Sequence, residues 1–374
     1  MAPSEPLENA ARFVYVSRAR LHRPRANVIQ TIKTAEGLAR IGVSVALFVP
    51  PWKGTRSKDE ILNDMGVDVP LGIRADSGLR SFWKPMAFAP FFWRHKKRLQ
   101  NAPVVYTRSA VLSLALMKHG IPHSFEVHDM DALQRQNVLQ RLMEGYTKGL
   151  IRRFFPISQA AAQGFLDLGV PPERVHVCPC GVDLGLFENI APWDPSGLKR
   201  PHIMYVGRIS RHRGLSLLER LAVQETFRVT VVGSLEDSPE TERIGVIPFV
   251  PHHQIPRYLE QADILVMPYQ RNLPHAGSIS PMKLFEAMAA GRPILVSDLE
   301  PIREIARHGR NALCVDPDDE EAWLEAVRFL QEHPGFAREL AARAQKDAAR
   351  YSWENRARIL RDTLLAEKPE HAHG

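Results

Sequence analysis

The segment DILVMPYQRNLPHAGSISPMKLFEAMAAGRPILVSD, residues 263–298, decides the fold. Short apolar runs at 263–268 and 292–298 flank a segment of helical period at 281–290, and Gly291 is placed to close that helix. Two strands joined by a helix form a βαβ unit, which belongs to a parallel sheet. The segment therefore predicts an α/β fold.

The same alternation runs through most of the chain. We expect strands at 12–17, 43–50, 103–107, 123–129, 152–158, 174–179, 202–207, 227–233, 244–250, 263–268, 292–298 and 312–315. Helices are expected at 29–42, 110–120, 159–169, 214–222, 252–262, 281–290, 319–333 and 352–367. The proline-rich stretch 188–201 lacks either period. We therefore expect two doubly wound domains, 1–190 and 201–350, with a linker at 191–200 and a disordered tail at 367–374.

Composition sets broad limits on function. The 374 residues are 44% hydrophobic and 24% charged, a globular composition, and the formal net charge of +7 suits nucleic acid, anionic lipid or a phosphorylated small molecule. Three cysteines fit no disulfide framework and favour a reducing compartment. The amino terminus resembles no signal peptide, and no apolar run is long enough to span a membrane. We expect a cytoplasmic protein.

Lys283 is unusual because it lies near the amino end of a helix, where the dipole repels cations. Ser280 is placed to cap this helix, and Pro281 suits its first position. A phosphate at the helix end would reverse the repulsion. Glu286, one turn on, can accept hydrogen bonds from a ribose diol. The alternative is a surface ion pair between Lys283 and Glu286, worth about 0.3 kcal/mol.

A second basic segment follows another strand. MYVGRISRHRG, residues 204–214, ends a strand at Gly207 and continues with Arg208, Arg211 and Arg213. Paired arginine forks can clamp a diphosphate. A solvated basic loop is the alternative. Since ligands of parallel sheets bind beyond the carboxyl ends of the strands, the two segments together favour a nucleotide diphosphate.

Four segments carry a family resemblance: YVGRISRHRGLSLL, HVCPCGVDLGLF, IPFVPHHQIPRYLEQADILVMPY and SPMKLFEAMAAGRPILVSD. In this order and spacing they resemble the retaining glycosyltransferases of family four, which have the GT-B fold. The resemblance is specific in the carboxyl-terminal half and thinner before it. It implies two Rossmann-like domains facing a central cleft, with a sugar-nucleotide donor held mainly by the second. It also implies a final helix, at about 351–366, that crosses back onto the first domain.

The resemblance assigns roles residue by residue. Arg208 and Arg213 match the basic pair on the donor diphosphate, and Glu286 matches the carboxylate on the nucleotide ribose. His128 matches a histidine that reaches the transferred sugar. The remaining donor-binding positions it implies are Asn27, Gly207, Gly277, Ser278, Ile279, Ser280 and Lys283, and the expected base loop contains Phe249 and Val250.

Two departures affect specificity. Ser278 stands where the family carries the first glutamate of a Glu-(x)7-Glu motif, and a hydroxyl cannot replace a carboxylate that grips sugar hydroxyls. The loop 17–27 lacks the usual glycine pair. The donor base, the donor sugar and the acceptor therefore stay open. Transfer with retention, no metal and no cofactor are expected.

Residues 79–99 interleave aromatic and basic side chains. Such a mixture suits an anionic membrane surface and a polyprenyl- or other lipid-linked acceptor, whereas a partly buried helix with a solvated basic end is equally common. The residues expected to contact membrane or acceptor are Trp83, Phe92, Trp93, Lys96 and Lys97. With this surface, the protein would lie on the inner face of the cytoplasmic membrane.

Other functions remain as alternatives. A catalytically degenerate sugar-nucleotide-binding subunit would carry Ser278 as its lesion. A GT-B sugar-nucleotide epimerase would lack the combination of Arg208, Arg213 and Lys283. A nucleic-acid partner is not expected, because only residues 79–99 resemble a basic stripe with stacking aromatics.

Overall fold

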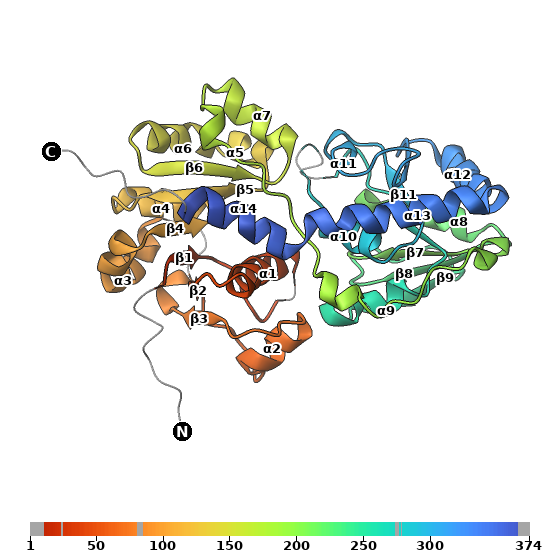
Figure 1. Cartoon of the computed structure of the whole chain (residues 1–374), viewed down its shortest axis with the longest axis horizontal. Coiled ribbons are helices and arrows are strands. Elements are labelled where there is room, and N and C mark those ends of the chain that lie inside the picture. Colours follow the sequence, from red (N-terminus) through yellow and green to blue (C-terminus); the bar gives the residue numbers. More distant parts are fainter. Residues whose placement is uncertain (1–10, 24, 81–84, 274–276, 278, 366–374) are drawn as a thin grey trace. The chain divides into compact units, whose positions relative to one another are not determined.

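The computed structural model describes residues 11–23, 25–80, 85–273, 277 and 279–365 (Figure 1). The chain divides into two compact units. Unit 1 comprises Met1–Asn63, Val67–Cys180 and Trp353–Gly374, and unit 2 comprises Asp64–Gly66 and Gly181–Ser352. The chain thus leaves unit 1 before the expected linker at 191–200, and a 3-10 turn at Pro195–Lys199 packs within unit 2.

Unit 1 is built on a six-stranded parallel sheet of order β3-β2-β1-β4-β5-β6. Its strands are β1 (Phe13–Val16), β2 (Val45–Val49), β3 (Gly72–Ala75), β4 (Val104–Thr107), β5 (His123–Val127) and β6 (Ile151–Pro156). Its helices are α1 (Ala26–Arg40), α2 (Lys58–Asp64), α3 (Ala89–Asn101), α4 (Ala110–Lys118), α5 (Met130–Arg135), α6 (Val138–Thr147), α7 (Gln159–Asp167) and α14 (Trp353–Leu365).

Unit 2 repeats this plan with the order β12-β11-β10-β7-β8-β9, again parallel throughout. Its strands are β7 (His202–Val206), β8 (Arg228–Val232), β9 (Ile244–Ile247), β10 (Ile264–Met267), β11 (Ile294–Ser297) and β12 (Leu313–Val315). Its helices are α8 (Leu215–Ala222), α9 (Ile255–Leu259), α10 (Met282–Ala289), α11 (Glu300–Arg303), α12 (Glu320–Glu332) and α13 (Pro334–Ala348). The doubly wound α/β fold predicted from the sequence is confirmed.

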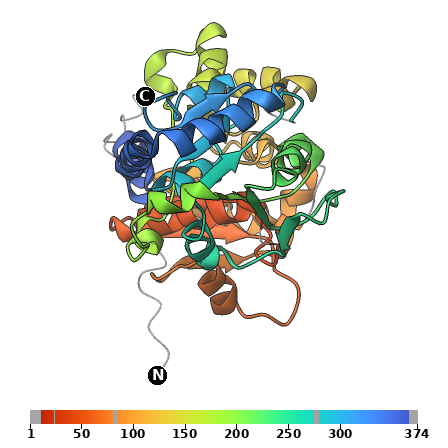
Figure 2. The same cartoon turned by 90° about the vertical axis from the view of Figure 1, so that its right-hand side faces the viewer.

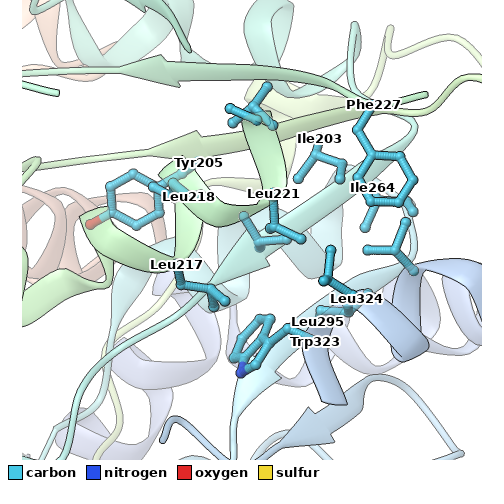
Figure 3. Packing of buried hydrophobic residues seen from close by; sticks show 14 of the residues in the cluster. Ile203, Tyr205, Leu217, Leu218, Leu221, Phe227, Ile264, Leu295, Trp323 and Leu324 are labelled. Carbon is cyan, nitrogen blue, oxygen red and sulfur yellow. The ribbon is translucent and has the colours of Figure 1, made fainter. Parts of the chain in front are cut away.

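The core of unit 2 follows from the alternation of side chains along its strands. Ile203 and Tyr205 of β7 pack with Leu217 of α8 and Trp323 of α12 on one face (Figure 3). Met204, also on β7, faces a small space lined by α9 and α10 on the other. Helices therefore cover both faces of this sheet (Figure 2). Burial of each large apolar side chain contributes about 1.5–3 kcal/mol.

Helix α14 completes unit 1 although it is last in the sequence. It packs along α1 (Figure 1). A Cβ at Gly37 of α1 would lie 2.5 Å from the carbonyl oxygen of Trp353, so only glycine permits this close approach. Arg356 of α14 is buried, and its Nη1 donates to the carbonyl oxygens of Cys178 and Pro179, the latter at 2.6 Å. The final helix is thus fixed by backbone as well as side-chain contacts.

Several expected elements differ in the structure. The strand predicted at 174–179 is wrong: Val175 forms one isolated bridge to Phe154, and the segment runs past β6 without becoming a strand. Strand β3 was not predicted because its sequence, GIRA, has no apolar alternation and it lies half exposed at the sheet edge. Helix α13 was not predicted either. It begins at Pro334, directly after α12, and its core contacts are mainly small alanines.

Candidate functional site

In unit 2, β7 and β10 are neighbours, and the segments after them meet at one edge of the sheet. Gly207 follows β7 with φ 152°, and a Cβ there would lie 1.5 Å from the Nζ of Lys283. The glycine therefore leaves the space in which the Lys283 side chain, on the first turn of α10, crosses the end of β7. Both were predicted site residues, and the structure brings them into contact.

The Lys283 ammonium forms no ion pair among the described residues, although Glu286 and Glu236 act on it from farther away. Its Nζ lies 3.4 Å from the hydroxyl of Tyr205 and 5.1 Å from the centre of that ring. The Tyr205 hydroxyl points away from the other core side chains labelled in Figure 3 and donates to the carbonyl oxygen of Arg208 at 2.8 Å. Burial, followed by the positive charge of Arg213, lowers the pKa of Lys283 to about 7, although Glu286 opposes this shift. An anion bound here would restore the charged ammonium.

The three arginines after β7 differ in their partners. Arg211 pairs with Glu219 at 2.5 Å and Glu240 at 2.7 Å, so it does not join the cationic cluster that the sequence suggested. Arg208 is half exposed and pairs with Glu236 at 2.9 Å. The guanidinium of Arg213 forms no ion pair or hydrogen bond within the described part of the chain. Lys283 and Arg213 are thus two neighbouring cations without a carboxylate partner among the described residues.

Glu286 lies one turn beyond Lys283 and is only 8% exposed. Its Oε1 lies 2.6 Å from the Nε2 of His252, while Nδ1 of His252 is buried without a described partner. His252 begins a 3-10 turn, His252–Gln254, at the end of the expected base loop. In that loop Phe249 is 47% exposed and Val250 is partly buried. A carboxylate fixed at one oxygen, with the other available, suits recognition of a hydroxyl.

The amino end of α10 differs by one residue from expectation. The helix begins at Met282, and the extended Pro281 occupies the capping position, so the predicted cap at Ser280 is wrong. Proline has no side-chain acceptor, and the first-turn amides of the helix therefore keep their capacity to bind an anion. Ile279 and Ser280 are buried and Gly277 is exposed. Ser278 lies outside the described residues.

His128 follows β5 in unit 1, and its Nε2 contacts Oε1 of Glu126. Glu126 is fully buried, accepts a hydrogen bond from Tyr106 at 2.7 Å and pairs with Arg356 of α14 at 2.9 Å. Burial would raise the pKa of Glu126, but Arg356, His128 and Arg108 hold it well below its usual range. Burial, and then Arg108, lowers the pKa of His128 to about 4. A neutral imidazole therefore donates its Nε2–H to a carboxylate, which fixes the ring.

Asn27 is exposed in the first turn of α1. Its carbonyl oxygen accepts from Arg108 at 3.2 Å, and Arg108 also donates to Gln30, which in turn donates to Glu126. These contacts connect the starts of α1 and α4 to the His128 network. Asn27 and His128 thus belong to the same edge of the unit 1 sheet.

The residues of α3 that were assigned to a membrane or acceptor contact differ in their exposure to solvent. The assignment of Phe92 is wrong: its side chain is fully buried and stacks on His119, because it completes the apolar cluster beneath β1 and β2. Trp93 is 86% exposed, and Lys96 and Lys97 are exposed beside it. Trp83 lies outside the described residues. In the described ranges, no helix has the length and apolar character needed to cross a membrane.

The described residues contain no group of three or more His, Cys, Asp or Glu side chains arranged to hold a metal ion.

Sequence reasoning did not assign roles to three residues that complete these sites: Glu126, Arg356 and Tyr205. One of them carried a signal, since Glu126 is an acidic residue inside a fully buried strand. The other two gain their roles from contacts between distant segments.

Comparison with known families agrees with this geometry. The model of the family described as Glycosyltransferase Family 4 matches residues 28–186, and the model described as Glycosyl transferases group 1 matches residues 200–333. The chain belongs to glycosyltransferase family 4. Both matches fall on the doubly wound units, so the family resemblance noted in the sequence is confirmed.

Several curated relatives of this family 4 chain are named as glycosyltransferases. A D-inositol 3-phosphate glycosyltransferase from Nocardioides sp. is 28% identical over 238 residues, which cover 53% of this chain and 50% of the relative. An alpha-maltose-1-phosphate synthase from Mycolicibacterium smegmatis is 26% identical over 297 residues, 67% of this chain and 74% of the relative. The chain spans about half the length of the inositol phosphate glycosyltransferases it matches.

Solved structures share the fold. HepE from Anabaena, crystallised with UDP, has a TM-score of 0.73 at 15% identity over 95% of this chain and 100% of that one. Sucrose-phosphate synthase from Thermosynechococcus elongatus has a TM-score of 0.68 at 17% identity, with coverage of 95% and 100%. At these identities the likeness establishes the GT-B architecture of the family 4 chain.

Proposed function

We propose that this protein is a retaining glycosyltransferase that moves a sugar from a UDP- or GDP-linked donor to a glycan or lipid-linked acceptor in surface polysaccharide or glycolipid synthesis. The observation that carries the proposal is a pair of cations, Lys283 and Arg213, that have no carboxylate partner among the described residues and lie near Glu286, whose carboxylate contacts His252. The diphosphate of a bound nucleotide supplies negative charge to Lys283 and Arg213. Its ribose supplies a hydroxyl to Glu286.

In this proposal the leaving diphosphate is stabilised by protein charges. As the glycosidic bond loosens, negative charge builds on the diphosphate, and Lys283, Arg213, Arg208 and the first-turn amides of α10 offset it. The transferred sugar bonds to the acceptor oxygen, whose proton is released, and the nucleoside diphosphate departs. Because these cations supply the charge, we propose that no added metal is required, so that chelation with EDTA leaves the rate unchanged.

The remaining assignments are extensions of the same proposal. HepE binds UDP and UDP-glucose in its crystal structures, which supports a nucleotide-sugar donor here. The family resemblance assigns His128 to the transferred sugar, and a fixed neutral imidazole supports a binding role. Relatives named for amylovoran and colanic acid biosynthesis support a polysaccharide or glycolipid product.

We also propose that the protein lies at the inner surface of the cytoplasmic membrane through α3. The exposed Trp93 with Lys96 and Lys97 suits the boundary between headgroups and acyl chains. The wild-type protein should sediment with vesicles that contain phosphatidylglycerol, and Trp93→Ser should sediment less. A wild-type protein that stays in the supernatant would remove the membrane from the proposal.

A thermal-shift screen tests the donor site directly. UDP, GDP, ADP and their common sugar conjugates are added to the purified protein, and a ligand of the native state raises the midpoint by mass action. We expect nucleotides of one base to stabilise the protein. Lys283→Ala should lower the affinity for that nucleotide by about tenfold or more, since a charge-assisted contact is lost. Lys346→Ala is the matched control, because Lys346 is an exposed lysine of α13 in the same unit.

The outcomes separate the alternatives. No stabilisation of a folded protein by any nucleotide contradicts the donor site. Stabilisation without transfer to any acceptor, and without slow hydrolysis of the donor, favours a catalytically degenerate binding subunit. Analysis of the product anomer by NMR distinguishes retention from inversion.

A further inference from the structure

The segment that follows β8 is fixed against the segment that follows β7. These two strands are parallel neighbours, so both segments lie at the edge of the unit 2 sheet that Lys283 crosses. The amide of Ile209 donates to the carbonyl oxygen of Ser234 at 2.9 Å, and the amide of Glu236 donates to the carbonyl oxygen of Ile209 at 2.8 Å. The backbone therefore holds Glu236 close to Arg208.

Glu236 and Arg208 form an ion pair across these two segments. The Nη1 of Arg208 donates to Oε1 of Glu236 at 2.9 Å. The backbone of Arg208 is fixed as well, because its carbonyl oxygen accepts from the hydroxyl of Tyr205 at 2.8 Å. Both charged side chains are about half exposed. Their contact thus joins two anchored segments at a place that a ligand from solution can reach.

The negative charge of Glu236 also acts on the two cations that have no carboxylate partner among the described residues. The hydrogen bond from Arg208, and then the charges of Arg208 and Arg213, hold the pKa of the Glu236 carboxyl below its usual range, although burial opposes this shift. The pKa of Lys283 is lowered mainly by burial, and Glu236 acts on it in the opposite direction. One carboxylate therefore acts on all three side chains that we assign to the diphosphate.

Other acidic residues of the segment after β8 contact a different arginine. The carboxylate of Asp237 accepts from the backbone amide of Arg211 at 2.8 Å, and Glu240 pairs with the guanidinium of Arg211 at 2.7 Å. Arg211 also pairs with Glu219. Glu236 and Glu240 thus lie in the same segment but neutralise different arginines.

A carboxylate beside these cations opposes an incoming anion. A diphosphate that binds Arg208 has to separate the guanidinium from Glu236 or lie beside a like charge, and the repulsion grows with the charge of the ligand. The terminal phosphate of a nucleoside diphosphate loses its second proton at about pH 6, so at neutral pH this nucleotide carries about one more negative charge than its sugar conjugate. Glu236 therefore opposes the released nucleotide more strongly than the donor.

We propose that Glu236 competes with the diphosphate for Arg208 and thereby favours binding of the nucleotide sugar over the nucleoside diphosphate. The carboxylate pairs with Arg208 in the free protein, is displaced by the donor and pairs again as the nucleotide product leaves. Because it acts through Arg208, Glu236 is a positioning residue that sets selectivity. The inference rests on the proposed transferase function, since it concerns the donor site of the same enzyme.

The test compares Glu236→Gln with Glu240→Gln, which removes the same charge from the same segment but at Arg211. Affinities for UDP, UDP-glucose, GDP and GDP-mannose are measured by calorimetry on the full chain at about pH 7.5, above the second pKa of a terminal phosphate. For the base that binds, Glu236→Gln should bind the nucleoside diphosphate about threefold to fivefold more tightly, because a partly exposed ion pair no longer has to be broken. The gain for the sugar conjugate should be about twofold or less, and Glu240→Gln should change neither affinity.

Three results would overturn the inference. Weaker binding of the nucleoside diphosphate by a folded Glu236→Gln would mean that Glu236 orients Arg208 toward the ligand. Equal gains in Glu236→Gln and Glu240→Gln would assign the effect to the overall charge of the segment. Equal gains for the nucleoside diphosphate and for its sugar conjugate would remove the selectivity.

A double-mutant comparison tests whether the effect passes through Arg208. In the Arg208→Gln variant, adding Glu236→Gln should change the affinity for the nucleoside diphosphate by less than about twofold, since the competing contact is already absent. The full gain without Arg208 would contradict the competition. Thermal unfolding is recorded for every variant, so that a loss of fold is not taken for a loss of affinity.

Inorganic pyrophosphate separates this inference from the transferase proposal. Should no nucleotide bind the wild type, the transferase proposal fails by itself, and pyrophosphate is then titrated into the wild type and both single variants. Tighter binding of pyrophosphate by Glu236→Gln alone would support the competition at Arg208. The same affinity in all three proteins, or no binding to any of them, would overturn it.

Discussion

The two units handle charge in opposite ways. In unit 1, Glu126 is buried with Arg356, Tyr106 and the His128 ring as partners, and all three come from elements that the fold brings together. In unit 2, Lys283 and Arg213 are held near each other with no carboxylate partner in the described part of the chain. The first set of charges is therefore neutralised within the protein's own interior, whereas the second has no counter-charge among the described residues, which is the condition that the proposed donor site requires.

The largest effect on stability should come from removing Arg356, the cation that pairs with the buried Glu126 carboxylate. Arg356→Met leaves the Glu126 carboxylate buried without its cation, which typically costs about 3–5 kcal/mol of unfolding free energy. Urea denaturation measures this loss. Glu126→Gln/Arg356→Met should recover much of it, because a neutral pair needs no counter-charge. If Arg356→Met alone had an unfolding free energy within about 1 kcal/mol of the wild type, the Glu126–Arg356 ion pair would not be what stabilises this part of unit 1.

A smaller effect should appear in the pH dependence of stability and of donor affinity, because both depend on the protonation of Lys283. An unfolded lysine has a pKa of about 10.4, whereas that of Lys283 in the folded protein is about 7. Between these values the unfolded state holds the proton that the folded state lacks, so the stability contributed by this group rises with pH. A bound diphosphate favours the protonated form, so donor affinity should fall over the same interval.

The pH prediction is measured with a nucleotide sugar, whose diphosphate does not titrate near neutrality. Affinity and unfolding free energy are determined between about pH 7 and about pH 9, where Lys283 loses its proton in the free protein. Opposite slopes are expected for the wild type, and both should flatten in Lys283→Met. Parallel slopes would contradict the role of Lys283 at the diphosphate.

The smallest effect, on nucleotide affinity, should come from removing the hydrogen bond between His252 and Glu286. His252→Ala removes the hydrogen bond that fixes Oε1 and should weaken nucleotide binding by about 1 kcal/mol, roughly fivefold. Isothermal titration with the ribonucleotide and its 2′-deoxy and 3′-deoxy analogues should show which hydroxyl depends on this contact. The neighbouring His253→Ala is the control, since His253 contacts a backbone carbonyl instead. Equal losses of nucleotide affinity in His252→Ala and His253→Ala would mean that the conformation of the whole loop matters and that the His252–Glu286 contact has no specific role.

Much of the fold and part of the site were predictable. Apolar runs alternating with helical periods gave the parallel sheets, because strands buried on both faces must be apolar throughout. Gly207 was predictable because it directly follows β7, and Lys283 and Glu286 because they lie one turn apart at the start of the helix that follows β10. Phe92 was assigned to the surface wrongly, since its neighbours in the sequence are basic but its contacts are apolar. Arg211 likewise gains carboxylate partners that local sequence does not reveal.

Local periodicity in the sequence was enough to predict the doubly wound architecture, and the four quoted segments were enough to indicate the family. Residue types at strand ends and at the start of one helix indicated the positions proposed for a phosphate ligand. Only the tertiary structure decided which charges are satisfied, because ion pairing depends on contacts between distant segments. Arg356 meets Glu126 only after α14 has packed on α1, and Lys283 reaches the end of β7 only where Gly207 leaves room.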